Sequence, residues 1–215
     1  MVRLTIVTLC MLAAVIAGVP QFALGQDKPA LAANPRGVYA SINLRPAQDM
    51  INRLSAPYGS DKRIAIREVL GRPTAVMPPV LYALANTLAE DHPEEAIFWY
   101  HVGRIRAVYD ALRCRDKTAQ AGVLALRQQI GKELRDAQFY RRDRVLRIAK
   151  RAIEWDTENA RSYDERWISL YGKVAASSDG SDSDILVPEA EWPAILKHVH
   201  EAHLAAVEQF VAEKK

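Results

Sequence analysis

The densest group of charged side chains lies between residues 141 and 151. This stretch holds six basic residues and one acidic residue, Asp143. On a helix, such residues form either a solvated face whose long stems cover apolar surface, or a landing site that speeds association with an acidic protein. We assign Arg144, Arg147 and Arg151 as candidate contacts for an acidic partner. The whole basic group is Arg141, Arg142, Arg144, Arg147, Lys150 and Arg151.

A second group with ligand chemistry lies near the C-terminus, at His198, His200, Glu201 and His203. The spacing is not HExxH, and no cysteine lies nearby. A structural zinc site needs about four convergent ligands. We therefore predict no metal site and no cofactor, and keep metal binding by these histidines as a weaker alternative.

The chain offers little for nucleophilic catalysis. It contains neither a GxSxG motif nor a glycine-rich phosphate loop. Cys114 lies between Arg113 and Arg115, which favour a thiolate. The nearest candidate base on the same predicted helix is His101, roughly 20 Å away by helical rise. This separation excludes a dyad of the two, and we predict no catalytic residue.

An alternative of a different class stays open. Asp110, Asp164 and Glu165 are acidic residues that could line a pocket between helices in an enzyme or a small-ligand binder. Nothing in their spacing selects them for one reaction. A deep pocket ringed by polar groups would favour this alternative, and a shallow groove would favour a protein binder.

The N-terminal segment predicts the compartment. Met1–Gly25 carries one charge, Arg3, followed by an apolar run and by small residues at Ala23 and Gly25. This pattern is typical of a secretory signal peptide, and the run is short for a membrane span. We expect an exported chain that begins at Gln26, without a transmembrane segment, and that is periplasmic if the source is a Gram-negative bacterium.

Charge and cysteine content bound the mature chain. Without Arg3, 28 of the 29 basic residues remain against 26 acidic residues. This near balance argues against a nucleic-acid binder, and the many apolar residues argue against disorder. Cys114 is the one cysteine after residue 25, so no intramolecular disulfide can form and stability must come from packing.

Hydrophobic periodicity predicts an all-α domain over residues 46–215. Residues 26–45 lack a period and predict a flexible arm, and the Ser/Asp/Gly-rich stretch 176–187 predicts a mobile loop. Residues 61–70 fit either a short strand or a helix. Helices are expected over 46–54, from 78 to 88, 93–113, from 116 to 130, 139–155, 159–171 and from 188 to the C-terminus.

Two stretches resemble tetratricopeptide or Sel1-type helical repeats. Tyr82–Leu88 and Pro93–Tyr100 resemble the two helices of one unit, and Ala152–Ala160 resembles the joint between two units. The equivalent positions Ala96 and Val145 are 49 residues apart by their numbers, whereas the family period is about 34. The resemblance therefore implies an irregular array of antiparallel helix pairs.

The resemblance also implies a binding surface for a protein segment. The family's concave face maps onto Tyr82, Asn86 and Glu90. Trp99 and Arg106 pair an aromatic ring with a guanidinium group, which suits either an interface anchor or a helix-pair core. The sequence thus predicts an exported, non-enzymatic helical protein that binds another protein, of the adaptor, envelope assembly or toxin-immunity type.

Overall fold

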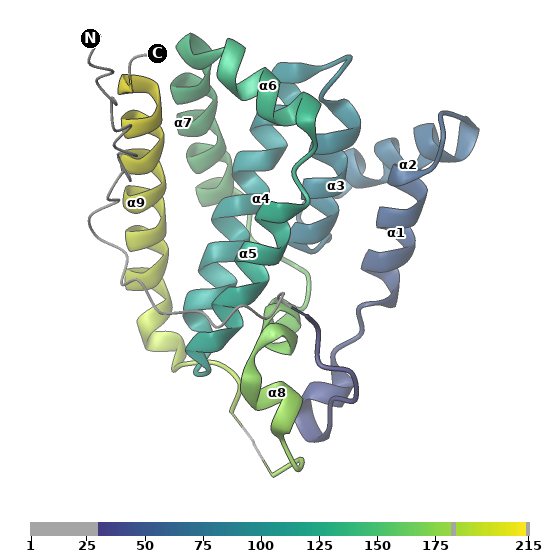
Figure 1. Cartoon of the computed structure of the whole chain (residues 1–215). Helices are drawn as coiled ribbons and strands as arrows, with labels where there is room; N and C mark the ends of the chain where they lie inside the picture. The colour runs from purple at the N-terminus through teal and green to yellow at the C-terminus, as the bar shows by residue number, and fades with distance from the viewer. Residues whose placement is uncertain (1–29, 182–183, 214–215) are drawn as a thin grey trace, which may run out of the picture.

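The computed structural model describes residues 30–181 and 184–213, which are mostly helical (Figure 1). The predicted all-α class is confirmed. Within these residues the one β-type pairing is an isolated bridge between Cys114 and Leu186. The predicted signal peptide lies outside the described residues. The α-helices are α1 Arg45–Ser55, α2 Ser60–Gly71, α3 Pro78–Leu88, α4 Pro93–Arg113, α5 Ala121–Gln128, α6 Lys132–Tyr140, α7 Arg142–Glu158, α8 Lys173–Ser177 and α9 Trp192–Ala212.

Helix α4 runs through the middle of the molecule, between α9 on one side and α3 on the other (Figure 1). Its ends suit the helix dipole, because Glu94 and Glu95 lie in its first turn and Arg113 in its last. It is buried along most of its length. Polar side chains on α4 must therefore find partners inside the protein.

Helices α3 and α4 form the closest helix pair. A side chain at Gly103 would place its Cβ 3.1 Å from Tyr82 Cδ2 and 3.2 Å from Leu81 Cβ. The absence of a side chain at Gly103 therefore lets α3 approach. This agrees with the expected packing of one helix pair, while the irregular array of such pairs stays a prediction.

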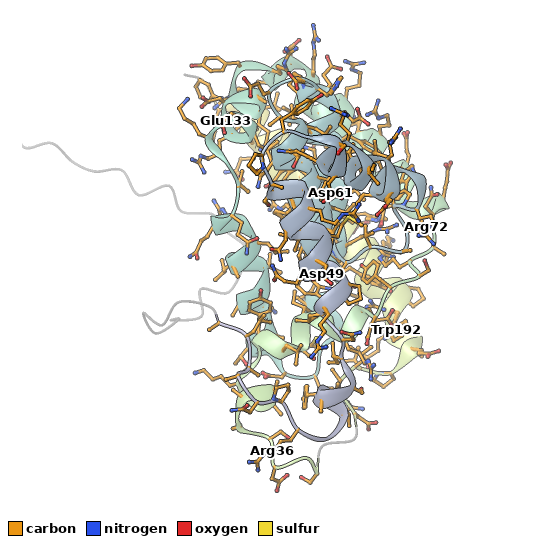
Figure 2. The ribbon with its side chains drawn as sticks, turned by 90° about the vertical axis from the view of Figure 1, so that its right-hand side faces the viewer. Arg36, Asp49, Asp61, Arg72, Glu133 and Trp192 are labelled. Carbon is orange, nitrogen blue, oxygen red and sulfur yellow. The ribbon has the colours of Figure 1, made fainter. Side chains whose placement is uncertain are left out.

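Helices α1 and α2 form a small layer outside α3. Asp49 of α1 and Asp61 of α2 lie on the side turned toward the viewer in Figure 2. Arg53 joins the two helices through ion pairs with Glu68 at 2.6 Å and with Asp61 at 3.2 Å. The stretch 61–70, which fitted a strand or a helix, is helical.

Two predicted helices in the second half have different boundaries. The expected helix over 139–155 is divided at Arg141 (φ −117°, ψ 31°), because α6 packs on α4 and α3 whereas α7 packs on α4 and α9. The expected helix over 159–171 is wrong. Residues 159–164 are not helical, and Glu165–Tyr171 form the 3-10 helix η3.

The predicted flexible arm and mobile loop are partly packed. In the arm, Tyr39 and Ile42 are buried on or beside the 3-10 helix η1, Gly37–Ser41. In the loop, Ile185 is buried and its carbonyl accepts the backbone N–H of Arg115 at 2.9 Å. Burial of apolar side chains therefore holds parts of the predicted arm and of the predicted loop against the core, although their polar composition predicted flexibility.

Candidate functional site: a basic and aromatic corner

The predicted basic group lies where α6 ends and α7 begins, beside two aromatic residues. Tyr140 is 76% exposed and Phe139 is 39% exposed. Exposed aromatic rings beside arginines are typical of protein interfaces. We call this surface the basic-aromatic corner. It comprises Phe139, Tyr140, Arg141, Arg142, Arg144, Arg147, Lys150 and Arg151.

Arg142 holds the aromatic part of the corner together. Its guanidinium lies 4.8 Å from the Phe139 ring centre and 4.6 Å from that of Phe210 on α9, and it also donates to the carbonyl of Glu213. Its Nε is buried without a hydrogen-bond partner. Arg142 thus joins α6, α7 and the end of α9 at this surface.

The other arginines of the corner leave its charge largely uncompensated. Arg144 and Arg147 share one carboxylate, Glu94 at the start of α4, with 3.6 Å between Arg147 Nη2 and Glu94 Oε2. Arg144 also pairs with Asp143, with 3.6 Å between Arg144 Nε and Asp143 Oδ2. The hydrogen bond from Arg144 lowers the pKa of Glu94, against a smaller effect of burial. Arg151 lies over the Phe98 ring at 4.4 Å. Several guanidinium groups therefore share few carboxylates and stay at the surface.

The position of the corner on α7 strengthens its positive potential. The first turn of a helix carries about half a positive charge, and basic residues there are unfavourable for the helix itself. Arg142 and Arg144 nevertheless lie in the first turn of α7. Asp143 lies in the same turn and suits the dipole, but the dipole does not favour the two arginines at this end.

Three predicted contacts on α3 lie elsewhere. Tyr82 is 2% exposed and packs edge to face on Tyr100, and burial raises its pKa. The expectation that Tyr82 faces a partner is wrong, because its ring fills the space beside Gly103. The Asn86 amide donates to Gln129 O and accepts the N–H of Gly131, both at 2.9 Å. Glu90 is exposed after the end of α3.

Trp99 and Arg106 belong to the core. Trp99 is 7% exposed, and its ring centre lies 5.4 Å from that of Trp155. Arg106 is fully buried, and its Nε lies 2.9 Å from Asp156 Oδ1. Of the two readings left open for these residues, the structure supports core packing. Trp155 itself is half-buried and also packs edge to face on Phe98, with 6.2 Å between the ring centres.

Asp156 is the centre of a polar network that the sequence analysis missed. Besides Arg106, it accepts from Arg161 at 2.7 Å and faces His200 Nε2 at 3.0 Å. Burial disfavours its charge, but the His200 hydrogen bond and the two guanidinium groups lower its pKa. The signal for this network in the sequence was Asp156 itself, a single aspartate on the otherwise apolar face of α7.

Asp110 centres a second buried network on α4. Its carboxylate accepts hydrogen bonds from Arg113 at 2.7 Å, Trp167 Nε1 at 2.8 Å and the Tyr163 hydroxyl at 3.0 Å. The Cys114 thiol donates to Asp110 O at 3.4 Å, and burial raises its pKa to about 12. Asp110, one of the residues considered for a pocket, is thus committed to structural partners.

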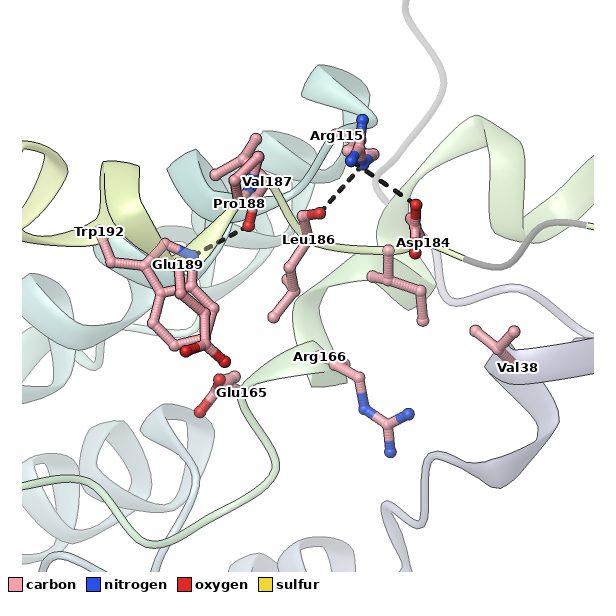
Figure 3. Close-up of a pocket in the computed structure, with 11 residues that line it drawn as sticks. Val38, Arg115, Glu165, Arg166, Asp184, Leu186, Val187, Pro188, Glu189 and Trp192 are labelled. Atoms are coloured by element: carbon pink, nitrogen blue, oxygen red, sulfur yellow. Dashed lines mark hydrogen bonds and ion pairs between the residues drawn. The ribbon is translucent and has the colours of Figure 1, made fainter.

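A cavity of about 470 Å³ lies beside the end of α4 (Figure 3). Glu165 and Trp192 line it, but Glu165 pairs with Arg113 at 3.2 Å and the Trp192 indole donates to Val187 O. Arg115 pairs with Asp184 at 3.6 Å, as the dashed line in Figure 3 shows. These charges are matched within the protein rather than directed at a ligand.

The C-terminal histidines are separated by their contacts. His203 Nε2 lies 3.0 Å from His101 Nδ1 on α4, His200 faces Asp156, and His198 is exposed. Among residues 30–181 and 184–213, we find no group of three or more His, Cys, Asp or Glu side chains able to hold a metal ion.

Comparisons with known proteins add no relative. No protein-family model matches the chain, and neither a curated protein nor a solved structure matches it. In the part of the chain that the structure describes, none of the helices has the length and apolar character needed to cross a membrane. The function is therefore argued from the geometry of the chain itself.

Proposed function

We propose that this protein is exported and, without catalysing a reaction, binds an acidic segment of another protein through the basic-aromatic corner. The observation that carries the proposal is the juxtaposition of the 76% exposed Tyr140 with arginines that outnumber the carboxylates around them. Aromatic and arginine side chains dominate binding energy at protein interfaces. The signal peptide predicted at residues 1–25 supports a location outside the cytoplasm.

The cavity beside Trp192 favours a second candidate, a small-ligand binder. Its volume of about 470 Å³ lies within the range of ligand sites. Of its charged side chains, Arg115, Glu165 and Asp184 have the partners described above, and Arg166 pairs with Asp164 at 2.7 Å. The corner, in contrast, presents excess charge and exposed rings, and therefore supports protein binding better.

Crosslinking in living cells tests the proposal. A photoreactive amino acid replaces Tyr140 or Lys150 in one set of strains, and Arg67 on the exposed face of α2 in the matched control. We expect the two corner positions to capture the same protein, identified by mass spectrometry, and the control position to miss it. Capture of the same proteins at all three positions, or of none, would contradict the proposal.

Charge reversal then tests the electrostatic part. Arg144→Glu with Arg147→Glu should lower the association rate with the captured protein about tenfold or more, because long-range attraction accelerates encounter. The control variant, Arg63→Glu with Arg67→Glu, changes charge equally on α2. Stopped-flow measurements at two salt concentrations decide the matter, since the difference between the variants should shrink at high salt.

A further inference from the structure

Helix α9 is held on α4 and α7 by a stripe of side chains that contains two histidines. Val199, His203 and Val207 are its buried residues, and His200 is half-buried between them. A packed helix normally presents an apolar stripe to its neighbours. The middle of this stripe therefore consists of groups whose charge depends on pH.

The contact between His203 and His101 allows one proton and no more. His101 Nδ1 and His203 Nε2 are 3.0 Å apart, and the two rings meet edge to face with their centres 5.0 Å apart. At this distance one N–H donates to one lone pair, whereas two N–H groups would point at each other. His101 Nε2 is buried and has no hydrogen-bond partner, so a second proton on this ring would find no acceptor. We call these two residues the histidine pair.

The surroundings of the histidine pair offer no counter-charge. From α4, Arg104 adds positive potential, and Tyr100 packs on His101 as a neutral ring. From α9, a protonated His200 adds positive charge near the pair, while its own contact with Asp156 at 3.0 Å becomes an ion pair that holds α9 on α7. Asp156 of α7 lies beyond His200, and its carboxylate is committed to Arg106 and to a second guanidinium. An imidazolium in the pair would thus be a buried cation without a partner.

Burial accordingly disfavours protonation of both rings. It lowers the pKa of His101 to about 3 and the pKa of His203 well below its ordinary value, and Arg104 adds to both shifts. Once separated and hydrated, each imidazole regains a pKa near 6.5. The separated state therefore binds more protons below about pH 6.5, so acid favours separation, by up to about tenfold per pH unit for each histidine.

We propose that α9 is an acid-sensitive latch, in which protonation of the histidine pair releases this helix from α4 and α7 under mildly acidic conditions. The release is local for a structural reason. Among the described elements, α9 packs mainly on α4, α7 and the adjoining 3-10 helix η4, Glu189–Glu191, whereas α4 also packs on α3, α5 and α6. A terminal helix can detach while the remaining packed helices keep their contacts. Release would also remove Phe210 from Arg142 in the basic-aromatic corner.

Hydrogen exchange followed by mass spectrometry tests the latch in the chain that begins at Gln26. The protein is compared near neutral pH and near pH 5, with exchange times corrected for the intrinsic rate. We expect the opening constant of α9 to rise about tenfold to a hundredfold per pH unit below about pH 6.5, while α3 keeps its protection. The measurement needs no partner, so its outcome is separate from that of the proposed function.

Two variants and one control locate the effect. His101→Asn with His203→Gln keeps a hydrogen bond between α4 and α9 but cannot titrate, and should abolish the pH dependence of α9. His198→Gln changes an exposed histidine of the same helix and should behave as the wild type. Should the paired variant not fold, the wild-type pH series alone still decides, because equal loss of protection in α3 and α9, or constant protection of α9, would overturn the proposal.

Discussion

At the scale of single residues, the buried charges define how this core is built. Arg106 and Asp156 are both inaccessible to solvent, and their ion pair joins α4 to α7 at 2.9 Å. Taking two charges out of water costs several kcal/mol per ion, which close contact and further hydrogen bonds must offset. Arg106 also donates to Asn159 O, and Asp156 accepts from Arg161. The ion pair therefore stabilises the fold only when both partners and these further hydrogen bonds are present.

Replacement of one partner should be worse than replacement of both. Asp156→Leu leaves the Arg106 guanidinium buried without its carboxylate and should lower the free energy of unfolding by about 3–5 kcal/mol. The double variant with Arg106→Met should recover part of this loss, because it removes the fully buried guanidinium that Asp156→Leu leaves unpaired. Urea unfolding of the wild type, both single variants and the double variant measures the coupling. Strictly additive losses would show that the two residues do not act together.

At the scale of helices, the contact between α3 and α4 depends on one missing side chain. The 3.1 Å between a Cβ at Gly103 and Tyr82 Cδ2 is shorter than ordinary van der Waals contact. Tyr82 is itself held by Tyr100 across the same pair of helices. An added methyl group therefore pushes on a ring that has little room to move.

Alanine substitutions at two glycines should affect the free energy of unfolding differently. Gly103→Ala should lower the free energy of unfolding by about 1–3 kcal/mol through overpacking. Gly71→Ala, at the last residue of α2, meets nothing within 4 Å and should be neutral or stabilise by up to about 1 kcal/mol. Thermal and urea unfolding measure both. A Gly103→Ala protein as stable as the wild type would mean that α3 and α4 can separate at little cost.

The sequence predicted most helices, because their apolar spacing and their prolines at helix starts are local signals. The 3-10 helix η3 was not predictable in this way. Tyr163 and Trp167 both reach Asp110, more than fifty residues earlier, and these long-range hydrogen bonds override the local preference for α-helix. The break at Arg141 likewise follows from which helices α6 and α7 pack on.

The site was only partly predictable for the same reason. The basic run of α7 is visible in the sequence, and Arg144, Arg147 and Arg151 do lie at the surface. Tyr82 was misplaced and Arg106 stayed open between interface and core, because aromatic and arginine side chains occur at surfaces and in cores alike. The exposed Tyr140 directly precedes the basic run and was the signal for the aromatic half of the corner.

At the scale of the whole molecule, residues 30–44, before the first α-helix, are part of the fold. Ala32 donates its backbone N–H to Leu170 O at 2.8 Å, and Tyr39 and Ile42 are buried in the core. Each large apolar side chain buried in this way contributes about 1.5–3 kcal/mol relative to exposure. Residues 30–44 thus cover the end of the helical domain that lies at the bottom of Figure 1.

A protein truncated to begin at Arg45 should melt at least roughly 5 °C lower than one that begins at Gln26. The reason is loss of the buried Tyr39 and Ile42, since about 1 kcal/mol shifts the Tm of a chain of this size by about 2–4 °C. Calorimetry measures the shift. The variant Ile42→Ala in the longer protein is the control for the loss of one buried side chain. Equal Tm values for the two lengths would support the flexible arm that the sequence predicted.

Because Cys114 is buried, its alkylation reports how often the surrounding structure opens. It is the one cysteine after residue 25, its side chain is inaccessible, and it lies between the end of α4 and Leu186. A bulky alkylating reagent can attack this sulfur only while the surrounding helices are apart, and the reaction is irreversible. The fraction of alkylated molecules therefore rises with every rare opening event. Mass spectrometry can measure this fraction in the wild-type protein without an engineered label.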